Sequence, residues 1–476
     1  MPLVLGVDSS TQSTKVEARD IATGKVVIRG NAAHPPTTPP RSEQDPVAWW
    51  AALTEAIAQL GEHRSDVVAI SVAGQQHGLV LLDAAGDALR PAKLWNDTTS
   101  APQADRLVEA FGAERWATAI GSVPVAAFTI TKLAWVAEHE PELLDRVAHV
   151  MLPHDYITWR LTGQHVTDRG DASGSGWFDP TGDKVIADLL GAAVGGDGTT
   201  WLDRVPRVLG PNEAAGTITA EAAASLGLPA DLLVGPGSGD NMGAALGLGL
   251  RAGDVAVSLG TSGTVFAVSD TATHDPSGAV AGFASASGEF LPLVCTLNAT
   301  KVTDTVARWL GTDPPGLAEL ALTAVEDPGS ALLVPYFDGE RTPNLPDATG
   351  TFAGLTNTTT RAQLALAAHD GVLCGLLNGV DALRQVGATI GGRVFLIGGG
   401  SRSVAYRQRC ADLLGQTITV PDSDETVAAG AAVQAAAITN GEPLGVISQR
   451  WQLGVGTDVT PQSDGSAIRQ RYATLS

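Results

Sequence analysis

Short apolar runs separated by polar turns make up the start of the chain. Pro2 to Val7 is an apolar run of strand length, Lys15 to Arg19 alternates charged and apolar residues, and a turn at Gly24 leads to a third segment, Lys25 to Ile28. Apolar runs of this length, bounded by turn residues, are typical of β-strands. The pattern predicts strands that meander through the beginning of a sheet.

A helical pattern comes next. Asp45 and Pro46 supply an N-cap and a first-turn proline for an amphipathic helix that ends near Gly61. Two more short strands, Val67 to Val72 and Leu79 to Leu82, follow this helix. We therefore expect an α/β fold in which helices cover a mixed sheet.

The strand, turn and strand pattern occurs twice. LGVDSSTQSTKV spans Leu5 to Val16, and DVAVSLGTSGTVFAV spans Asp254 to Val268. A chain of 476 residues is also too long for a single core. The repeat predicts two domains of related design that face each other, at residues 1–230 and 231–445. The pattern does not define how the C-terminal tail, 446–476, packs.

The charge balance restricts the choice of partners. Asp and Glu number 51 against 30 Lys and Arg, so the net charge is −21. Such a charge repels phosphate backbones and anionic lipid at long range, and we expect neither a nucleic-acid nor a membrane partner. The longest apolar stretch, Val427 to Ile438, is too short to cross a bilayer.

The predicted location is the cytoplasm. Cys295, Cys374 and Cys410 lie far apart without metal-ligand spacing, as expected of free thiols in a reducing compartment. The N-terminus has no basic region and reaches Asp8 early, so we do not expect a signal peptide.

Both hydroxyl-rich turns suit phosphate. Backbone N–H groups of a tight Gly, Ser and Thr turn converge on an anion, and the hydroxyls add donors without bulk. Asp8 precedes the first turn and could hold Mg²⁺ beside a phosphate. An Asp at the end of a strand is also a common turn former, and that interpretation stays open.

Two further glycine-rich junctions carry candidate chemistry. RVFLIGGGSRS, from Arg393 to Ser403, would let a flat ring or a ribose approach the backbone closely. VGPGSGDNMG, from Val234 to Gly243, puts Asp240 and Asn241 at the start of a predicted helix. A simple tight turn and a helix N-cap are the alternative interpretations. The P-loop and G-x-G-x-x-G patterns do not occur.

Taken together, these motifs resemble the FGGY family of carbohydrate kinases over nearly the whole chain. In chain order they are Asp8 with its SSTQSTK loop, GQQHG (74–78), LWND (94–97), GSGDN (237–241), SLGTSG (258–263), GERTPN (339–344) and GGGSRS (398–403). Within the family, GQQHG with LWND, TDRGDASGSGWFD (167–179) and GERTPN are more similar to kinases of xylulose than to those of glycerol. Gln76 stands where relatives often carry Met, which bears on the choice of sugar.

The resemblance implies two actin-like (ribonuclease H-like) domains with the active site in the interdomain cleft. It implies these roles: Asp8 for Mg²⁺; Thr11, Gln12, Ser13 and Lys15 for the γ-phosphate; Thr261 and Gly263 for a second phosphate loop; Gly400 and Ser403 near adenosine; Gln76, His77, Asp240 and Asn241 for the sugar. Asp240 is also the implied general base, for which an ordinary ionised carboxylate would suffice.

The function that follows from the resemblance is phosphorylation of D-xylulose to D-xylulose 5-phosphate by ATP and Mg²⁺. One alternative is a kinase for ribulose or another polyol. Another, from a different class, is an actin- or Hsp70-like ATPase module, which would have no use for a sugar-contacting histidine opposite an acid. Whether two chains form a homodimer is left open.

Overall fold

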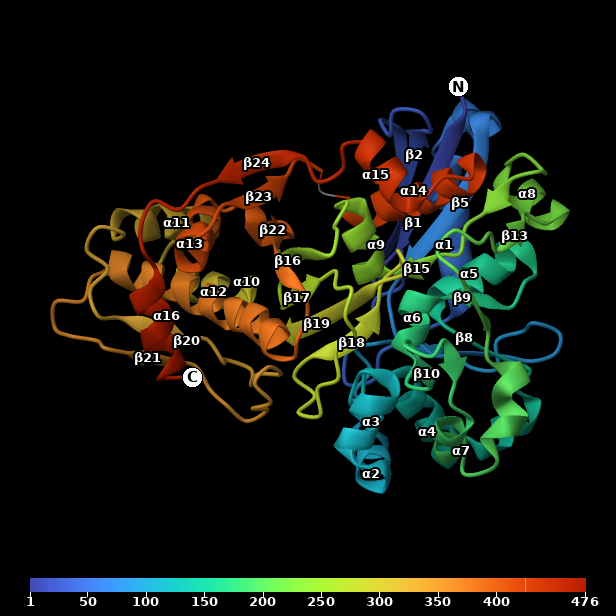
Figure 1. Cartoon of the computed structure of the whole chain (residues 1–476), viewed down its shortest axis with the longest axis horizontal. Helices are drawn as coiled ribbons and strands as arrows, with labels where there is room; N and C mark the ends of the chain where they lie inside the picture. Colours follow the sequence, from blue (N-terminus) through green and yellow to red (C-terminus); the bar gives the residue numbers. More distant parts are fainter. Residues whose placement is uncertain (424) are drawn as a thin grey trace.

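The structure, a computed structural model, describes residues 1–423 and 425–476. Within these ranges the chain forms two α/β units, each built on a seven-stranded sheet. Figure 1 shows the units side by side, with the N-terminal strands in one and the segments drawn in orange in the other.

The first sheet has the strand order β13-β14-β5-β1-β2-β3, with β15 beside β5. β1 and β2 are antiparallel, whereas β1 and β5 are parallel. The strands are β1 (Leu3–Ser9), β2 (Ser13–Asp20), β3 (Val26–Ala33), β5 (Val67–Gly74), β13 (Gly216–Thr217), β14 (Leu233–Val234) and β15 (Ser238–Gly239). The strands predicted at the start of the chain are confirmed.

Helices cover both faces of this sheet. Because side chains alternate along a strand, Leu3 and Leu5 of β1 face one helical layer and Val4 faces the other. The first layer holds α1 (Pro46–Ala58), α5 (Pro153–Thr162) and α8 (Ala220–Leu226); the second holds α9 (Asp240–Gly247) and α14 (Thr426–Asn440). Asp45 caps α1 by accepting the N–H of Val47 at 2.9 Å, as predicted.

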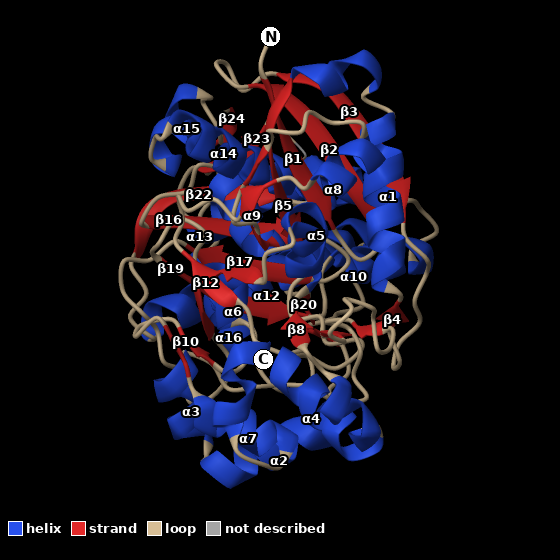
Figure 2. Ribbon diagram, turned by 90° about the vertical axis from the view of Figure 1, so that its right-hand side faces the viewer, coloured by secondary structure: helices blue, strands red, loops and turns tan. Residues whose placement is uncertain are grey.

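A helical lobe extends the first unit and lies at the bottom of Figure 2. It contains α2 (Ala101–Phe111), α3 (Ala113–Ile120), α4 (Thr129–His139) and α7 (Ala187–Val194), with α6 (Arg169–Ser173) above. The first unit also contains four separate strand pairs: β4 (Glu43–Gln44) with β7 (Ala92–Lys93), β6 (Val80–Leu82) with β8 (His149–Met151), β9 (Val166–Asp168) with β12 (Arg207–Leu209), and β10 (Phe178–Asp179) with β11 (Lys184–Val185).

The second sheet has the strand order β18-β19-β17-β16-β22-β23-β24. Its strands are β16 (Gly253–Leu259), β17 (Gly263–Ala267), β18 (Ala281–Ala284), β19 (Phe290–Thr296), β22 (Ile390–Ile397), β23 (Ile418–Pro421) and β24 (Gly456–Val459). One face packs on α10 (Thr300–Trp309), α11 (Pro314–Thr323), α12 (Arg361–Gln385) and α13 (Val404–Leu414), with β20 (Leu332–Val334) and β21 (Thr351–Ala353) nearby. From the other face, Phe266 and Phe395 share a core with the first unit.

The sheets divide the chain differently from the predicted boundary at residue 230. β14, β15 and α9 all follow residue 230, yet β14 and β15 pair with β5 of the first sheet. Near the C-terminus, α14 packs on β1 and β5, so a segment assigned to residues 231–445 also belongs to the first unit. Parallel strands are joined by long crossover connections, and a linear boundary cannot represent them.

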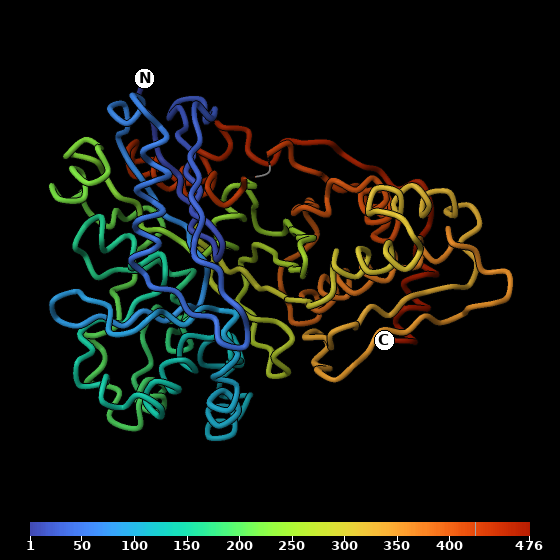
Figure 3. Tube along the Cα trace, turned by 180° about the vertical axis from the view of Figure 1, so that it is seen from behind, coloured from blue at the N-terminus to red at the C-terminus, as the bar shows by residue number. Residues whose placement is uncertain are grey.

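The tail contacts both units. After α15 (Leu444–Arg450), Nε1 of Trp451 donates to the carbonyl of Ile21 at 3.2 Å in the first unit. The chain then returns to the second unit, where β24 pairs with β23 and α16 (Ser466–Ala473) packs on α12 and α13. Figure 3 shows this last crossing as the red tube between the units. Among the described residues, no helix combines the length and apolar character needed to cross a membrane.

Candidate active site

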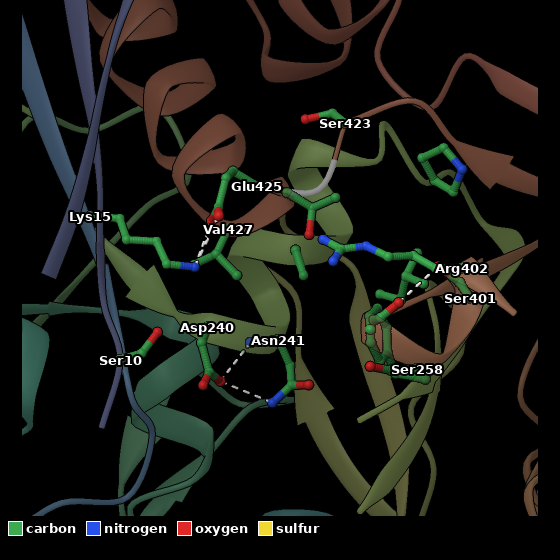
Figure 4. A pocket seen from close by; sticks show the side chains of 17 residues that line it. Ser10, Lys15, Asp240, Asn241, Ser258, Ser401, Arg402, Ser423, Glu425 and Val427 are labelled. Atoms are coloured by element: carbon green, nitrogen blue, oxygen red, sulfur yellow. Dashed lines mark hydrogen bonds and ion pairs between the residues drawn. The ribbon is translucent and has the colours of Figure 1, made fainter. Parts of the chain in front are cut away.

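Two cavities between the units share Asp240, Asn241 and Ser258. The first, the glycine-rich cavity, encloses about 360 Å³. Its lining includes Ser10, Lys15 and Glu425 on one side and Ser401 and Arg402 on the other (Figure 4). Gly398 and Gly399 also line it. The second, the His77 cavity, encloses about 330 Å³; its lining includes Gln76, His77, Trp95, Phe283, Cys295 and Arg341.

Asp240 lies where the two cavities meet and is the first residue of α9. Its Oδ1 accepts the backbone N–H of Asn241 at 2.8 Å and the Nδ2 of the same residue at 2.9 Å. Nδ2 of Asn241 also donates to Oε1 of Gln76 at 2.8 Å, which joins three predicted sugar contacts in one network. Gly239 occupies the N-cap position, so Asp240 is not the cap of this helix.

The surroundings of Asp240 favour a carboxyl group that exchanges protons near neutral pH. Burial, and then the nearby negative charge of Asp8, raise the pKa of Asp240 to about 7. The raised pKa was not expected from the sequence, because the sequence does not reveal how deeply this group is enclosed. A base with a pKa near the working pH is well suited to take a proton during a reaction.

The first hydroxyl-rich turn brings Asp8 and Lys15 together. They are paired residues on β1 and β2, so both side chains lie on the same face of the sheet. Oδ1 of Asp8 accepts the hydroxyl of Ser10 at 2.5 Å, and Nζ of Lys15 forms an ion pair with Glu425 at 2.9 Å. Burial raises the pKa of Asp8 to about 6. Glu425, which the sequence analysis missed, fixes Lys15 from a position 410 residues along the chain.

The middle of the same turn lies outside the lining of both cavities. Oγ1 of Thr11 donates to Gln75 at 3.1 Å and accepts Nε1 of Trp95 at 2.9 Å. Gln12 is exposed, and Ser13 begins β2, where its carbonyl accepts the N–H of Ser10. In this conformation, Thr11 thus links the turn to Trp95, which lines the His77 cavity.

His77 presents a hydrogen-bond acceptor to its cavity. Its backbone is left-handed, with φ 65°, and its ring stacks on Phe128 with a centroid separation of 5.1 Å. Burial lowers the pKa of His77 to about 3, so the ring is neutral at physiological pH. Nδ1 lies 2.9 Å from the carbonyl of Gly174 and must carry the proton, because a carbonyl only accepts. Nε2 is then the acceptor.

In the second turn and the GGGSRS segment, the residues that line the cavities are mostly neighbours of the predicted ones. Gly263 lines the His77 cavity, whereas Thr261 is exposed and its carbonyl accepts the N–H of Ala299. Gly400 packs on the end of β16, where an added Cβ would meet Leu259 at 2.8 Å. Ser403 caps α13. Ser258 and the neighbours Gly398, Gly399, Ser401 and Arg402 line the glycine-rich cavity instead.

The carboxylates at the site suit a cation that is also bound by phosphate oxygens. Within residues 1–423 and 425–476, no cluster of three or more His, Cys, Asp or Glu side chains could hold a metal by itself. Mg²⁺ is usually held by one or two carboxylates together with substrate phosphates. Asp8 and Asp240 are close enough for the charge of one to raise the pKa of the other, and both could serve such an ion.

Trp95 and Arg341 belong to the His77 cavity without having been predicted as site residues. Trp95 lies in the LWND motif and Arg341 in GERTPN, so the motifs marked both positions although no role was inferred for them. Trp95 follows His77 closely in the sequence and Arg341 lies far downstream, and the fold brings all three into the lining of one cavity.

Comparisons with known protein families and proteins find matches along nearly the whole chain. Residues 3–247 match the N-terminal domain, and residues 255–438 the C-terminal domain, of the FGGY family of carbohydrate kinases. Xylulose kinase of Streptomyces rubiginosus is 48% identical over 456 residues, which are 96% of this chain and 92% of that protein.

Solved structures show the same arrangement. The crystal structure of xylulose kinase from Bifidobacterium adolescentis has a TM-score of 0.90 and 42% identity, covering 100% of this chain and 99% of that one. Glycerol kinase from Plasmodium falciparum, solved with ADP, is 18% identical with a TM-score of 0.87, covers 100% and 96% of the two chains, and supports the fold alone. The expected pair of actin-like α/β domains is confirmed.

Proposed function

The chain belongs to the FGGY family of carbohydrate kinases, and we propose that it uses ATP to convert D-xylulose to D-xylulose 5-phosphate. The choice of sugar is supported by the xylulose kinases that it resembles at 48% and 42% identity. The observation that carries the mechanism is the position of Asp240 where two cavities of different chemistry meet. One cavity offers glycine backbone and cations, and the other offers amide, imidazole and aromatic groups.

The sugar binds in the His77 cavity in this proposal. Nε2 of His77 accepts a hydrogen bond from one hydroxyl, and the amide groups of Gln76 and Asn241 bond others. Asp240 orients the primary hydroxyl and takes its proton as the bond to phosphorus forms. The leaving nucleotide keeps the electrons of the broken P–O bond, so no further reactant is needed.

ATP binds in the glycine-rich cavity. Lys15 and Ser10 face the γ-phosphate, with Thr11, Gln12 and Ser13 completing that turn after the units close. Thr261 and Gly263 supply the opposite phosphate loop, and the segment containing Gly400 and Ser403 lies beside the adenosine. Asp8 would hold Mg²⁺, and the ion would offset the negative charge that develops on the phosphates. Closure aligns the phosphoryl group with the hydroxyl and excludes water.

An ADP-release assay across pentuloses and polyols tests the proposal. The highest kcat/KM is expected for D-xylulose. A higher value for ribulose or another polyol would change the assigned substrate but leave the assignment as a kinase. ADP release independent of every sugar would favour an ATPase module. The proposal includes a cytoplasmic location and free sugar and ATP as partners. Light scattering of the purified chain would decide between a monomer and a homodimer.

A further inference from the structure

We propose that Arg341, from the second unit, is a sugar-binding and specificity residue whose guanidinium donates hydrogen bonds to sugar hydroxyls in the His77 cavity. This inference rests on the proposed function and deepens it. Gln76, His77 and Asn241 contact the sugar from the first unit, so Arg341 would make the sugar itself a bridge between the two units.

The guanidinium of Arg341 is left unpaired by the part of the chain that the structure describes. No hydrogen bond or ion pair within residues 1–423 and 425–476 engages it, although its side chain is half-buried in the cavity wall. Arg90 and Arg409, by contrast, each contact carboxylates at 2.7–2.8 Å. A guanidinium is always charged and carries five donors, so an unpaired guanidinium in a cavity wall is available to a polar ligand.

The loop that carries Arg341 is held by its neighbour Glu340. The buried carboxylate of Glu340 accepts the N–H of Leu297 at 2.6 Å, the N–H of Arg341 at 2.8 Å and Nδ2 of Asn298 at 3.0 Å. Leu297 directly follows β19 and also lines the cavity. Glu340 thus anchors the GERTPN motif to the end of a strand, and the next residue is Arg341. An anchored backbone limits the entropy lost when the side chain binds a ligand.

The groups on the two walls are complementary for a hydroxyl. His77 offers an acceptor at Nε2, and Arg341 offers donors alone. A sugar hydroxyl can donate to the first and accept from the second, and two adjacent hydroxyl oxygens match the fork of a guanidinium. Burial and then the positive charge of Lys132 lower the pKa of His77, with a smaller contribution from the positive charge of Arg341. That charge helps to keep the ring neutral and able to accept.

Steady-state kinetics of Arg341→Gln test the assignment. Losing the guanidinium should raise KM for D-xylulose at least tenfold and leave KM for ATP within twofold of wild type. The matched control is Lys301→Gln, which removes a positive charge that pairs with Asp338 of the same loop outside the cavity lining. The control should change neither constant. An unchanged sugar KM in folded Arg341→Gln would overturn the assignment.

Cys295 supplies a readout that does not need turnover. It lines the His77 cavity and is partly exposed, whereas Cys374 and Cys410 are buried. D-xylulose without nucleotide should protect Cys295 of the wild type from alkylation by iodoacetamide. The extent of alkylation is measured by mass spectrometry. Arg341→Gln should react at the wild-type rate without sugar and need at least tenfold more sugar for half protection. Equal half-protection would contradict the proposal.

Failure of the proposed function would give different experimental results from failure of the role of Arg341. A wild type that neither phosphorylates D-xylulose nor is protected by it would change the substrate, and the same protection titration would then use the sugar selected by the ADP-release panel. A wild type that phosphorylates D-xylulose, combined with an Arg341→Gln variant of unchanged affinity, would overturn the role of Arg341 and leave the function standing.

Discussion

Nδ1 of His77 donates to the carbonyl of Gly174 across 2.9 Å, and this bond determines what the ring offers to a ligand. With the proton on Nδ1, Nε2 is an acceptor for a sugar hydroxyl. The two residues are 97 positions apart and meet because α6 brings the GSGWFD segment behind the GQQHG turn.

Replacing His77 by Ala should weaken sugar binding selectively. A lost hydrogen bond to a buried hydroxyl costs about 1–3 kcal/mol, which corresponds to a roughly 5- to 150-fold increase in KM for D-xylulose. KM for ATP should stay unchanged because the ring does not line the glycine-rich cavity. His63→Ala, in the short helix Gly61–Asp66, is the control. Normal sugar affinity in folded His77→Ala would show that His77 does not bind the sugar.

The pH profile should report Asp240 rather than His77. The raised pKa of Asp240, about 7, leaves the base protonated below that pH, so log(kcat/KM) for the sugar should fall with decreasing pH and approach a slope of one. His77, with a pKa lowered to about 3, should not titrate between pH 5 and 9. The measurement is kcat/KM across that range at saturating ATP. A flat profile down to pH 5 would contradict the raised pKa.

Lys15→Met should affect the nucleotide and spare the sugar. A charged donor to a phosphate contributes about 1.5–3 kcal/mol, so kcat/KM for ATP should fall about 10- to 150-fold. Lys25→Met removes an exposed lysine from the next turn and is the matched control. If kcat/KM for ATP does not change in Lys15→Met, then Lys15 serves only its ion pair with Glu425.

The packing of α9 against α14 should prove sensitive to a single methyl group. A Cβ on Gly247 would lie 1.8 Å from the carbonyl oxygen of Thr426, so Gly247→Ala must push the helices apart. Overpacking of this kind costs about 1–3 kcal/mol, and calorimetry should show a lower Tm. Because α9 begins with Asp240, kcat should fall as well.

Gly445→Ala is the matched control for this packing. A Cβ at Gly445 in α15 would have no neighbouring atom within 4 Å, and alanine is the better helix former. Its Tm should equal or exceed that of the wild type. If both variants melt like the wild type, close packing at Gly247 does not determine stability.

Local features of the fold were predictable because they depend on neighbouring residues. The hairpin of β1 and β2, the cap at Asp45 and the repeat at β16 and β17 follow from alternation and turn chemistry. The joint presence of Gln76, His77, Asp240 and Asn241 at one site was accessible through motifs, since their order resembled a known family.

Contacts between distant segments could not be predicted in the same way. The pairing of β14 with β5 and the return of α14 to the first sheet depend on how crossover segments pack. The ion pair of Lys15 with Glu425 and the position of Arg341 in the lining of the His77 cavity arise only after the units face each other. The pKa of Asp240 also depends on this enclosure, which no local pattern encodes.

The central claim is that Asp240 is the general base, and the turnover of Asp240→Asn tests it most directly. Asn keeps the shape and an acceptor for Asn241 but cannot take a proton at neutral pH. Losing a general base typically lowers the rate by ~10²–10⁴-fold. With folding verified by calorimetry and both substrates saturating, the account predicts a loss of kcat in this range with sugar protection of Cys295 intact. A kcat within a few-fold of wild type would contradict it.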